Sequence, residues 1–133
     1  MSGVPSSAGG APKRVLVVED DPSIRQLLSR ALQAQFQVSL CDNGTEALTA
    51  VREQSPDLVL LDVNLPGMDG FAIAAAMKDA ADLKSIPIIF LTARGRPTEV
   101  IQGIQAGARH YITKPFKIDE LLGKIRKVLT GKT

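Results

Sequence analysis

The segment Leu58–Gly70, with the sequence LVLLDVNLPGMDG, decides the fold of this chain. Four apolar residues, Leu58–Leu61, are followed by the carboxylate of Asp62 and then by a loop rich in proline and glycine. A short apolar run bounded by turn residues predicts a strand that is buried on both faces of a parallel sheet. Asp62 is then expected at the carboxyl end of this strand, where open α/β sheets bind their ligands.

Apolar strand patterns and helical patterns alternate five times along the chain. The expected strands are Arg14–Glu19, Phe36–Cys41, Asp57–Leu61, Ile86–Leu91 and Arg109–Ile112. The first expected helix begins at Pro22, the second includes Ala47–Val51 and the third includes Phe71–Ala76. The fourth and fifth are expected over Pro97–Ala106 and Ile118–Leu129. This alternation predicts a doubly wound, flavodoxin-like α/β fold with a five-stranded parallel sheet in the order 2-1-3-4-5.

The size and composition indicate one ordinary domain. The chain has 133 residues, of which 44% are hydrophobic. We expect residues 1–12 to be a disordered tail, residues 13–130 to form the domain and residues 131–133 to be a C-terminal tail. The apolar runs are too short for a membrane span, and the net charge of +2 is too small to argue for nucleic acid binding. The single cysteine, Cys41, fits a cytoplasmic location.

Polar side chains are expected to meet at one edge of the sheet. In the predicted order the first and third strands are neighbours, so Glu19 and Asp20 should lie close to Asp62. Thr92 ends the fourth strand and Lys114 follows the fifth, at the same edge. Two nearby aspartates have a different expected role, because Asp21 and Asp69 each precede a helix and are predicted to cap it.

Three neighbouring carboxylates repel one another, and a hard divalent cation removes that conflict. Mg²⁺, or Mn²⁺ in its place, suits an open edge that offers only oxygen ligands. No cluster of histidine or cysteine competes for a softer metal. A nucleophilic aspartate, a divalent cation, a hydroxyl and an ammonium group together indicate phosphoryl transfer.

Four motifs occur in a fixed order: VVEDD at residues 17–21, LLDVNLPGMDG at 60–70, LTA at 91–93 and YITKPF at 111–116. In this combination the chain resembles the receiver domain of bacterial two-component response regulators, over roughly residues 13–130. The resemblance implies that a histidine kinase or a phosphotransfer protein phosphorylates Asp62. It also implies that Glu19, Asp20, Asp62 and the backbone carbonyl of Asn64 hold Mg²⁺.

The resemblance assigns further residues to the phosphoryl group and to the switch. Thr92 and Lys114 contact the phosphoryl group, as do main-chain amides near Asn64 and Ala93. The Lys114–Pro115 peptide bond is expected to be cis. Tyr111 occupies the position of the switch aromatic, which turns inward when Thr92 moves toward the phosphoryl group. We expect Arg94 to modulate the access of water to the phosphoaspartate.

The expected output is a change in partner binding. In the family, the face formed by the fourth helix, the fifth strand and the fifth helix changes its affinity for a downstream protein or effector domain, and it can also form a homodimer. We expect neither direct nucleic acid binding nor membrane attachment from this domain. The chain is expected to be a stand-alone receiver or a domain cut from a longer regulator.

Two other functions compete with the signalling switch. The first is a degenerate receiver that acts only as a scaffold for other proteins, although all five key side chains are present. The second is an aspartate-nucleophile phosphatase of the haloacid dehalogenase type. Such enzymes place an acidic residue two positions after the nucleophile, where this chain has Asn64. Of these classes, only the phosphatase would be a true enzyme.

Overall fold

The computed structural model describes residues 12–92 and 110–130. Within them the strands are β1 (Arg14–Val18), β2 (Gln37–Cys41), β3 (Leu58–Asp62), β4 (Ile88–Thr92) and β5 (His110–Thr113). The helices are α1 (Pro22–Leu32), α2 (Ala47–Gln54), α3 (Gly70–Asp79) and α5 (Ile118–Thr130). The helix expected over Pro97–Ala106 lies outside the described residues.

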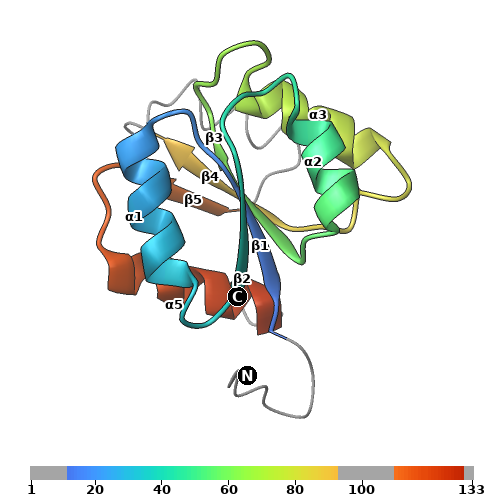
Figure 1. The fold of residues 1–133 in the computed structure, drawn as a ribbon. Coiled ribbons are helices and arrows are strands. Elements are labelled where there is room, and N and C mark those ends of the chain that lie inside the picture. Colours follow the sequence, from blue (N-terminus) through green and yellow to red (C-terminus); the bar gives the residue numbers. More distant parts are fainter. Residues whose placement is uncertain (1–11, 93–109, 131–133) are drawn as a thin grey trace.

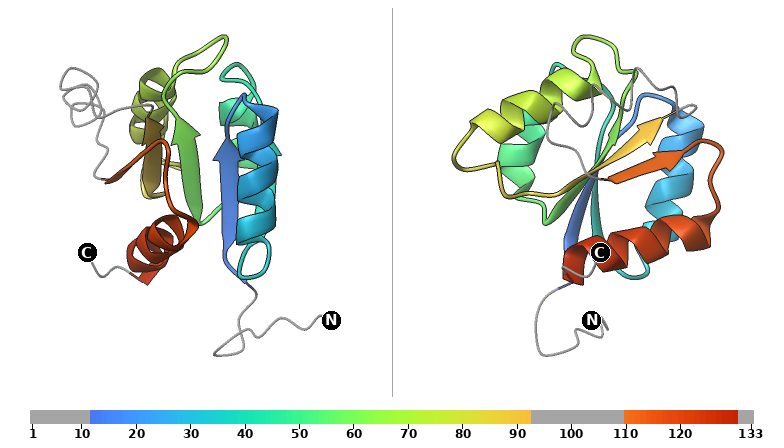
Figure 2. Two further views of the ribbon diagram at one scale, coloured as in Figure 1. Left: turned by 90° about the vertical axis from the view of Figure 1, so that its left-hand side faces the viewer. Right: turned by 180° about the vertical axis from the view of Figure 1, so that it is seen from behind.

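The five strands form one parallel sheet in the order β2-β1-β3-β4-β5, which confirms the predicted topology (Figure 1). β1 and β3 are neighbours, and their register pairs Val18 with Leu61. The sheet twists between two helical layers, which the two views of Figure 2 show from other sides. Helices α1 and α5 cover one face, and α2 and α3 cover the other.

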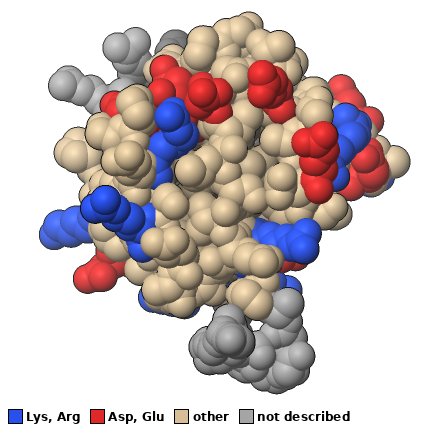
Figure 3. Space-filling model, in the orientation of Figure 1, with Lys and Arg blue, Asp and Glu red and all other residues tan. Residues whose placement is uncertain are grey.

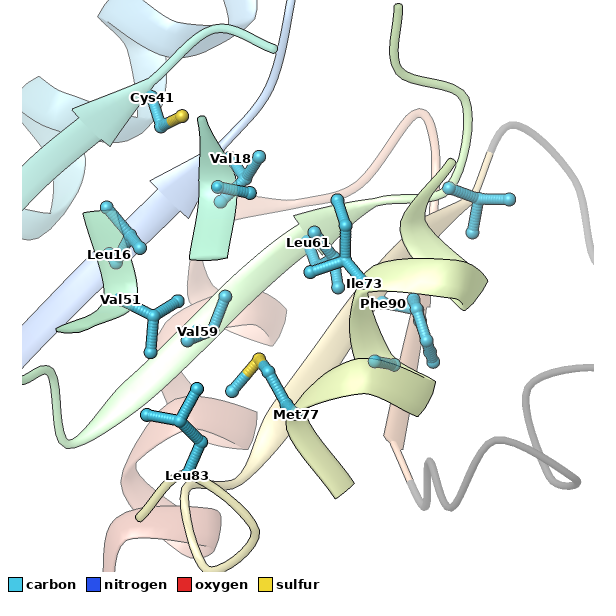
Figure 4. Packing of buried hydrophobic residues seen from close by; sticks show 13 residues of the cluster. Leu16, Val18, Cys41, Val51, Val59, Leu61, Ile73, Met77, Leu83 and Phe90 are labelled. Carbon is cyan, nitrogen blue, oxygen red and sulfur yellow. The ribbon is translucent and has the colours of Figure 1, made fainter. Parts of the chain in front are cut away.

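The core has two halves because the side chains of each strand alternate between the two faces of the sheet. Leu16, Val59 and Leu61 pack toward α2 and α3, together with Ile73 and Phe90 (Figure 4). The intervening strand residues pack toward α1 and α5 in the second cluster. All five residues of β3 are buried, as expected for a central strand covered on both faces.

Capping aspartates set the beginnings of two helices, as predicted. Asp21 precedes Pro22 at the start of α1, and its side chain accepts hydrogen bonds from the backbone N–H groups of Ser23 and Ile24. Asp69 accepts from the N–H of Ala72 at the start of α3. Each cap satisfies N–H groups that have no partner within the helix.

The structure corrects several details of the prediction. β4 begins at Ile88 rather than at Ile86, because Pro87 has no N–H to donate and contributes only its carbonyl, which accepts from Val59. β1 ends at Val18, one residue before Glu19. Leu27, whose spacing fits the apolar stripe of α1, is 48% exposed. None of the helices in the described ranges is long and apolar enough to cross a bilayer.

Candidate functional site

The carboxyl ends of four parallel strands bring the candidate side chains to one edge of the sheet. Asp62 is the last residue of β3, and Thr92 is the last residue of β4. Glu19 directly follows β1, and Lys114 directly follows β5. Parallel pairing of β1 with β3, and of β4 with both β3 and β5, fixes this convergence through the backbone.

Three carboxylates meet at this edge. Ligand oxygens of Glu19, Asp20 and Asp62 all lie within 4.8 Å of one another. Glu19 is fully buried and Asp62 is 4% exposed, whereas Asp20 faces solvent. In Figure 3, acidic side chains gather along the upper margin of the molecule, the end toward which the strands run in Figure 1.

Lys114 places its ammonium group between two of these carboxylates. Its Nζ lies 2.8 Å from Oε1 of Glu19 and 3.5 Å from Oδ2 of Asp62. The main-chain N–H of Lys114 donates to the carbonyl of Thr92 at 2.6 Å, which ties the loop after β5 to the end of β4. The peptide bond between Lys114 and Pro115 is cis.

Burial and neighbouring charges perturb the acid–base properties of the site. Burial and the nearby charge of Glu19 raise the pKa of Asp62 to about 7, although Lys114 and the N–H of Asn64 favour its ionised form. Burial alone would lower the pKa of Lys114, but Glu19 and Asp62 outweigh this effect and raise it. Without further positive charge, burial and Glu19 therefore disfavour the ionised form of Asp62.

The site fits a hard divalent cation. Its possible ligands are all oxygens, and Oε1 of Glu19 is buried without a hydrogen-bond partner among the described residues. The ammonium of Lys114 lies 2.8 Å from that oxygen and forms an ion pair with it. Three ionised carboxylates and one ammonium carry a net charge of −2, which a divalent cation neutralises.

Comparison with known proteins identifies the family. Residues 15–126 match the family model of the response regulator receiver domain. The chain belongs to this family.

Relatives and solved structures agree with this assignment. The receiver is 44% identical over 115 residues to the DNA-binding response regulator MtrA of Mycobacterium tuberculosis, covering 86% of this chain and 49% of MtrA. It is 40% identical over 119 residues to the response regulator MprA of Mycobacterium sp. strain KMS, covering 89% of this chain and 51% of MprA. The chain thus spans about half the length of these relatives. The structure of the chemotaxis protein CheY4 of Vibrio cholerae has a TM-score of 0.84 and 35% identity, covering 89% of this chain and 99% of that one.

The loop after β3, which carries Asn64, is anchored both to the site and to a second loop. The N–H of Asn64 donates to Oδ1 of Asp62 at 3.2 Å. On the other side, the N–H of Gly44 donates to the carbonyl of Pro66 at 3.0 Å. A Cβ at Gly44 would lie only 1.9 Å from the carbonyl oxygen of Met68, so a side chain at this position would force the two loops of the receiver apart.

Tyr111 in β5 lies against the aromatic part of the core. Its ring stacks on that of Phe90, with 5.7 Å between centroids and 25° between planes. Phe90 in turn meets Phe71 of α3 edge-on at 4.9 Å. Partial burial raises the pKa of the Tyr111 phenol. Tyr111 therefore connects the edge strand of the receiver to α3 through the fully buried Phe90.

Arg25 is a residue at this site that sequence reasoning missed. Its Nη1 donates to the carbonyl oxygens of Glu19 and Asp20, each at 3.0 Å. The sequence does contain a signal for Arg25, since this arginine stands near the beginning of a helix, where the helix dipole disfavours a cation. A cation at such a position suggests that it has a specific partner. Two expected site residues, Ala93 and Arg94, lie outside the described residues.

Proposed function

We propose that this receiver is a phosphorylation-controlled switch in which Asp62 accepts a phosphoryl group from the phosphohistidine of a histidine kinase or phosphotransfer protein. The observation that carries this proposal is the convergence of Asp62 with two further carboxylates and the ammonium of Lys114 at the carboxyl edge of the sheet. Asp62 is almost fully buried, yet it lies at the carboxyl edge of the sheet, as the last residue of β3. Such a carboxylate is costly to maintain for structural reasons alone.

In the proposed reaction, a carboxylate oxygen of Asp62 attacks phosphorus as the bond from phosphorus to the imidazole nitrogen breaks. The electron pair of that bond stays on the imidazole, which takes up a proton, and Asp62 becomes an acyl phosphate. Lys114 already lies beside Asp62, where its ammonium can bind a phosphoryl oxygen, and the hydroxyl of Thr92 and the amides near Asn64 and Ala93 would bind the others.

Glu19, Asp20, Asp62 and the backbone carbonyl of Asn64 are the proposed ligands of Mg²⁺, with Mn²⁺ as a substitute. When bound, the cation supplies positive charge that keeps Asp62 ionised and neutralises the transferred oxygens. The raised pKa of Asp62 explains why such charge is needed, since a protonated carboxyl group is a poor nucleophile. Asn64 and Arg94 are proposed to shape the path of water to the phosphoaspartate and hence its lifetime.

The proposed output is a change in protein binding. Thr92 and Tyr111 would transmit the phosphoryl signal to the face made by residues 97–106, β5 and α5, which binds a downstream partner, an effector domain or a second copy of the receiver. MtrA is named as a DNA-binding response regulator. We propose that the receiver acts in the cytoplasm and leaves any contact with DNA to a separate effector.

Phosphorylation with a small-molecule donor tests the proposal directly. The protein is incubated with acetyl phosphate in Mg²⁺ or in EDTA, and its intact mass and elution volume on a sizing column are measured. We expect one added phosphoryl group in Mg²⁺ only, none in Asp62→Asn, and normal modification of Asp69→Asn, which retains a capping side chain. Absence of modification in the wild-type protein would leave only the scaffold function.

A further inference from the structure

Arg25 of α1 turns its guanidinium group back toward the acidic end of β1. Its Nη1 lies 3.0 Å from the carbonyl oxygen of Glu19 and 3.0 Å from that of Asp20. We propose that Arg25 is a positioning residue for the cation site, which holds the backbone of residues 19 and 20 so that both carboxylates face Asp62. This inference rests on the proposed binding of Mg²⁺ at that site.

The backbone here needs such support because adjacent residues on an extended strand point to opposite faces of the sheet. Glu19 and Asp20 are adjacent, yet their ligand oxygens lie within 4.8 Å of each other and of Asp62. The chain therefore bends after β1, which ends at Val18, and the bend lies at Asp20. Mutual repulsion of the three carboxylates favours a more open arrangement of this turn, which Arg25 opposes by binding both carbonyl groups.

Other contacts fix the remaining sides of the turn. The N–H of Glu19 donates to the carbonyl of Cys41 at 3.0 Å, and the N–H of Asp21 donates to Oε2 of Glu19 at 3.1 Å. Asp21 itself caps α1, the helix that carries Arg25. The turn at residues 19–21 is thus attached to β2 through the N–H of Glu19 and to α1 through the cap of Asp21. The guanidinium contact also joins the carbonyl groups of Glu19 and Asp20 to α1.

The surroundings of Arg25 argue against a role as an ordinary surface charge. Arg25 lines a cavity of about 520 Å³ together with Asp42, Glu46 and Glu53. Among the described residues, however, no carboxylate lies within ion-pairing distance of its guanidinium group. Arg25 instead uses its donors on the carbonyl groups that precede α1, although the helix dipole disfavours a cation there.

Positioning and simple charge repulsion predict opposite effects on Mg²⁺ affinity. If Arg25 acted only as a nearby positive charge, removing it would tighten the binding of a cation. If Arg25 holds the turn, removing it weakens binding, on the order of tenfold, as is typical of residues that support metal ligands. The sign of the change therefore separates the two roles.

The test compares two substitutions of Arg25. Arg25→Met removes both the charge and the hydrogen-bond donors, whereas Arg25→Lys keeps the charge but lacks the planar guanidinium group. Arg30→Met is the matched control, because Arg30 is an exposed arginine in the last turn of the same helix. Mg²⁺ affinity is measured by calorimetric titration, and urea unfolding is followed in EDTA and in a series of Mg²⁺ concentrations. We expect the Kd for Mg²⁺ to rise about tenfold in Arg25→Met and less in Arg25→Lys, and to stay unchanged in Arg30→Met.

Four outcomes would overturn the inference, and they are distinguishable. Unchanged or tighter Mg²⁺ binding in Arg25→Met would show that Arg25 does not position the ligands. An equal loss of stability in EDTA and in Mg²⁺ would mean that Arg25 supports the fold only, because a weakened site must also reduce the stabilisation by Mg²⁺. Failure of the wild-type protein to bind Mg²⁺ would refute the cation site itself. If Arg25→Met does not fold, an unchanged Kd in Arg25→Lys overturns the inference.

Discussion

The ammonium group of Lys114 lies closer to Glu19 than to Asp62, at 2.8 Å from Oε1 of the glutamate and 3.5 Å from Oδ2 of the aspartate. Glu19 is fully buried, and that oxygen has no hydrogen-bond partner among the described residues. Among the described residues, Lys114 is therefore the cation that compensates the charge of the buried glutamate. The same ammonium remains near enough to Asp62 to meet an arriving phosphoryl group.

We predict that Lys114→Met destabilises the protein strongly when no metal is present. Removing one partner of a buried ion pair leaves an uncompensated charge, and the expected loss of unfolding free energy is about 3–5 kcal/mol. Urea unfolding in EDTA measures it. Lys127→Met, at an exposed position of α5, is the control and should change the free energy by less than about 0.5 kcal/mol. Similar losses in the two variants would contradict the prediction.

The pH dependence of stability should report on Asp62. Its pKa is about 7 in the folded protein but about 3.9 in an unfolded chain, so the folded state holds this proton more tightly. The stability that this proton confers is complete below about pH 4 and is lost as the pH rises through about 7. In EDTA, the wild-type protein should therefore lose roughly 4 kcal/mol relative to Asp62→Asn between pH 4 and pH 8. Parallel pH profiles of the two proteins, measured by urea unfolding, would refute this assignment.

The two loops joined at Gly44 should not tolerate a side chain there. We predict that Gly44→Ala costs about 2 kcal/mol or more of unfolding free energy, because the new Cβ would overlap the carbonyl of Met68. The loop after β3, which contains Met68, also carries Asn64, so phosphorylation by acetyl phosphate should also slow. Gly123→Ala in α5 is the matched control, since a Cβ there meets nothing within 4 Å. It should stabilise the protein by about 0.5–1 kcal/mol, as expected for alanine replacing a helical glycine. Equal effects of the two substitutions on thermal unfolding would be inconsistent with this packing.

Tyr111 offers a direct optical test of the switch. It is the only tyrosine in the chain, which has no tryptophan, so intrinsic fluorescence reports on this side chain alone. Adding Mg²⁺ and beryllofluoride should reduce acrylamide quenching if the ring turns inward from its present position against Phe90. Asp62→Asn should show no change. Unaltered quenching in a wild-type protein that has bound beryllofluoride would assign Tyr111 a static packing role.

Much of the fold could be predicted because its signals are local. The apolar run before Asp62 and the caps at Asp21 and Asp69 mark the central strand and two helices by short-range chemistry. The strand ends do not follow from local signals, because they depend on the pairing with neighbouring strands. β4 begins only after Pro87, because proline has no N–H to donate to the ladder with β3. Leu27 fits the helical spacing but is about half exposed, since spacing alone does not define how wide a stripe of the helix is covered.

The amino-acid sequence by itself determined which residue types stand at the ends of the strands: the carboxylates of Glu19, Asp20 and Asp62, the hydroxyl of Thr92 and the ammonium of Lys114. Only the tertiary structure decided which of those groups are buried and which of them pair with one another. It buries Glu19 and pairs it with Lys114, and it directs Arg25 to the backbone of the acidic turn. The physical reason is that residue type and spacing are local properties, whereas burial and pairing depend on which strands and helices the folded chain brings together.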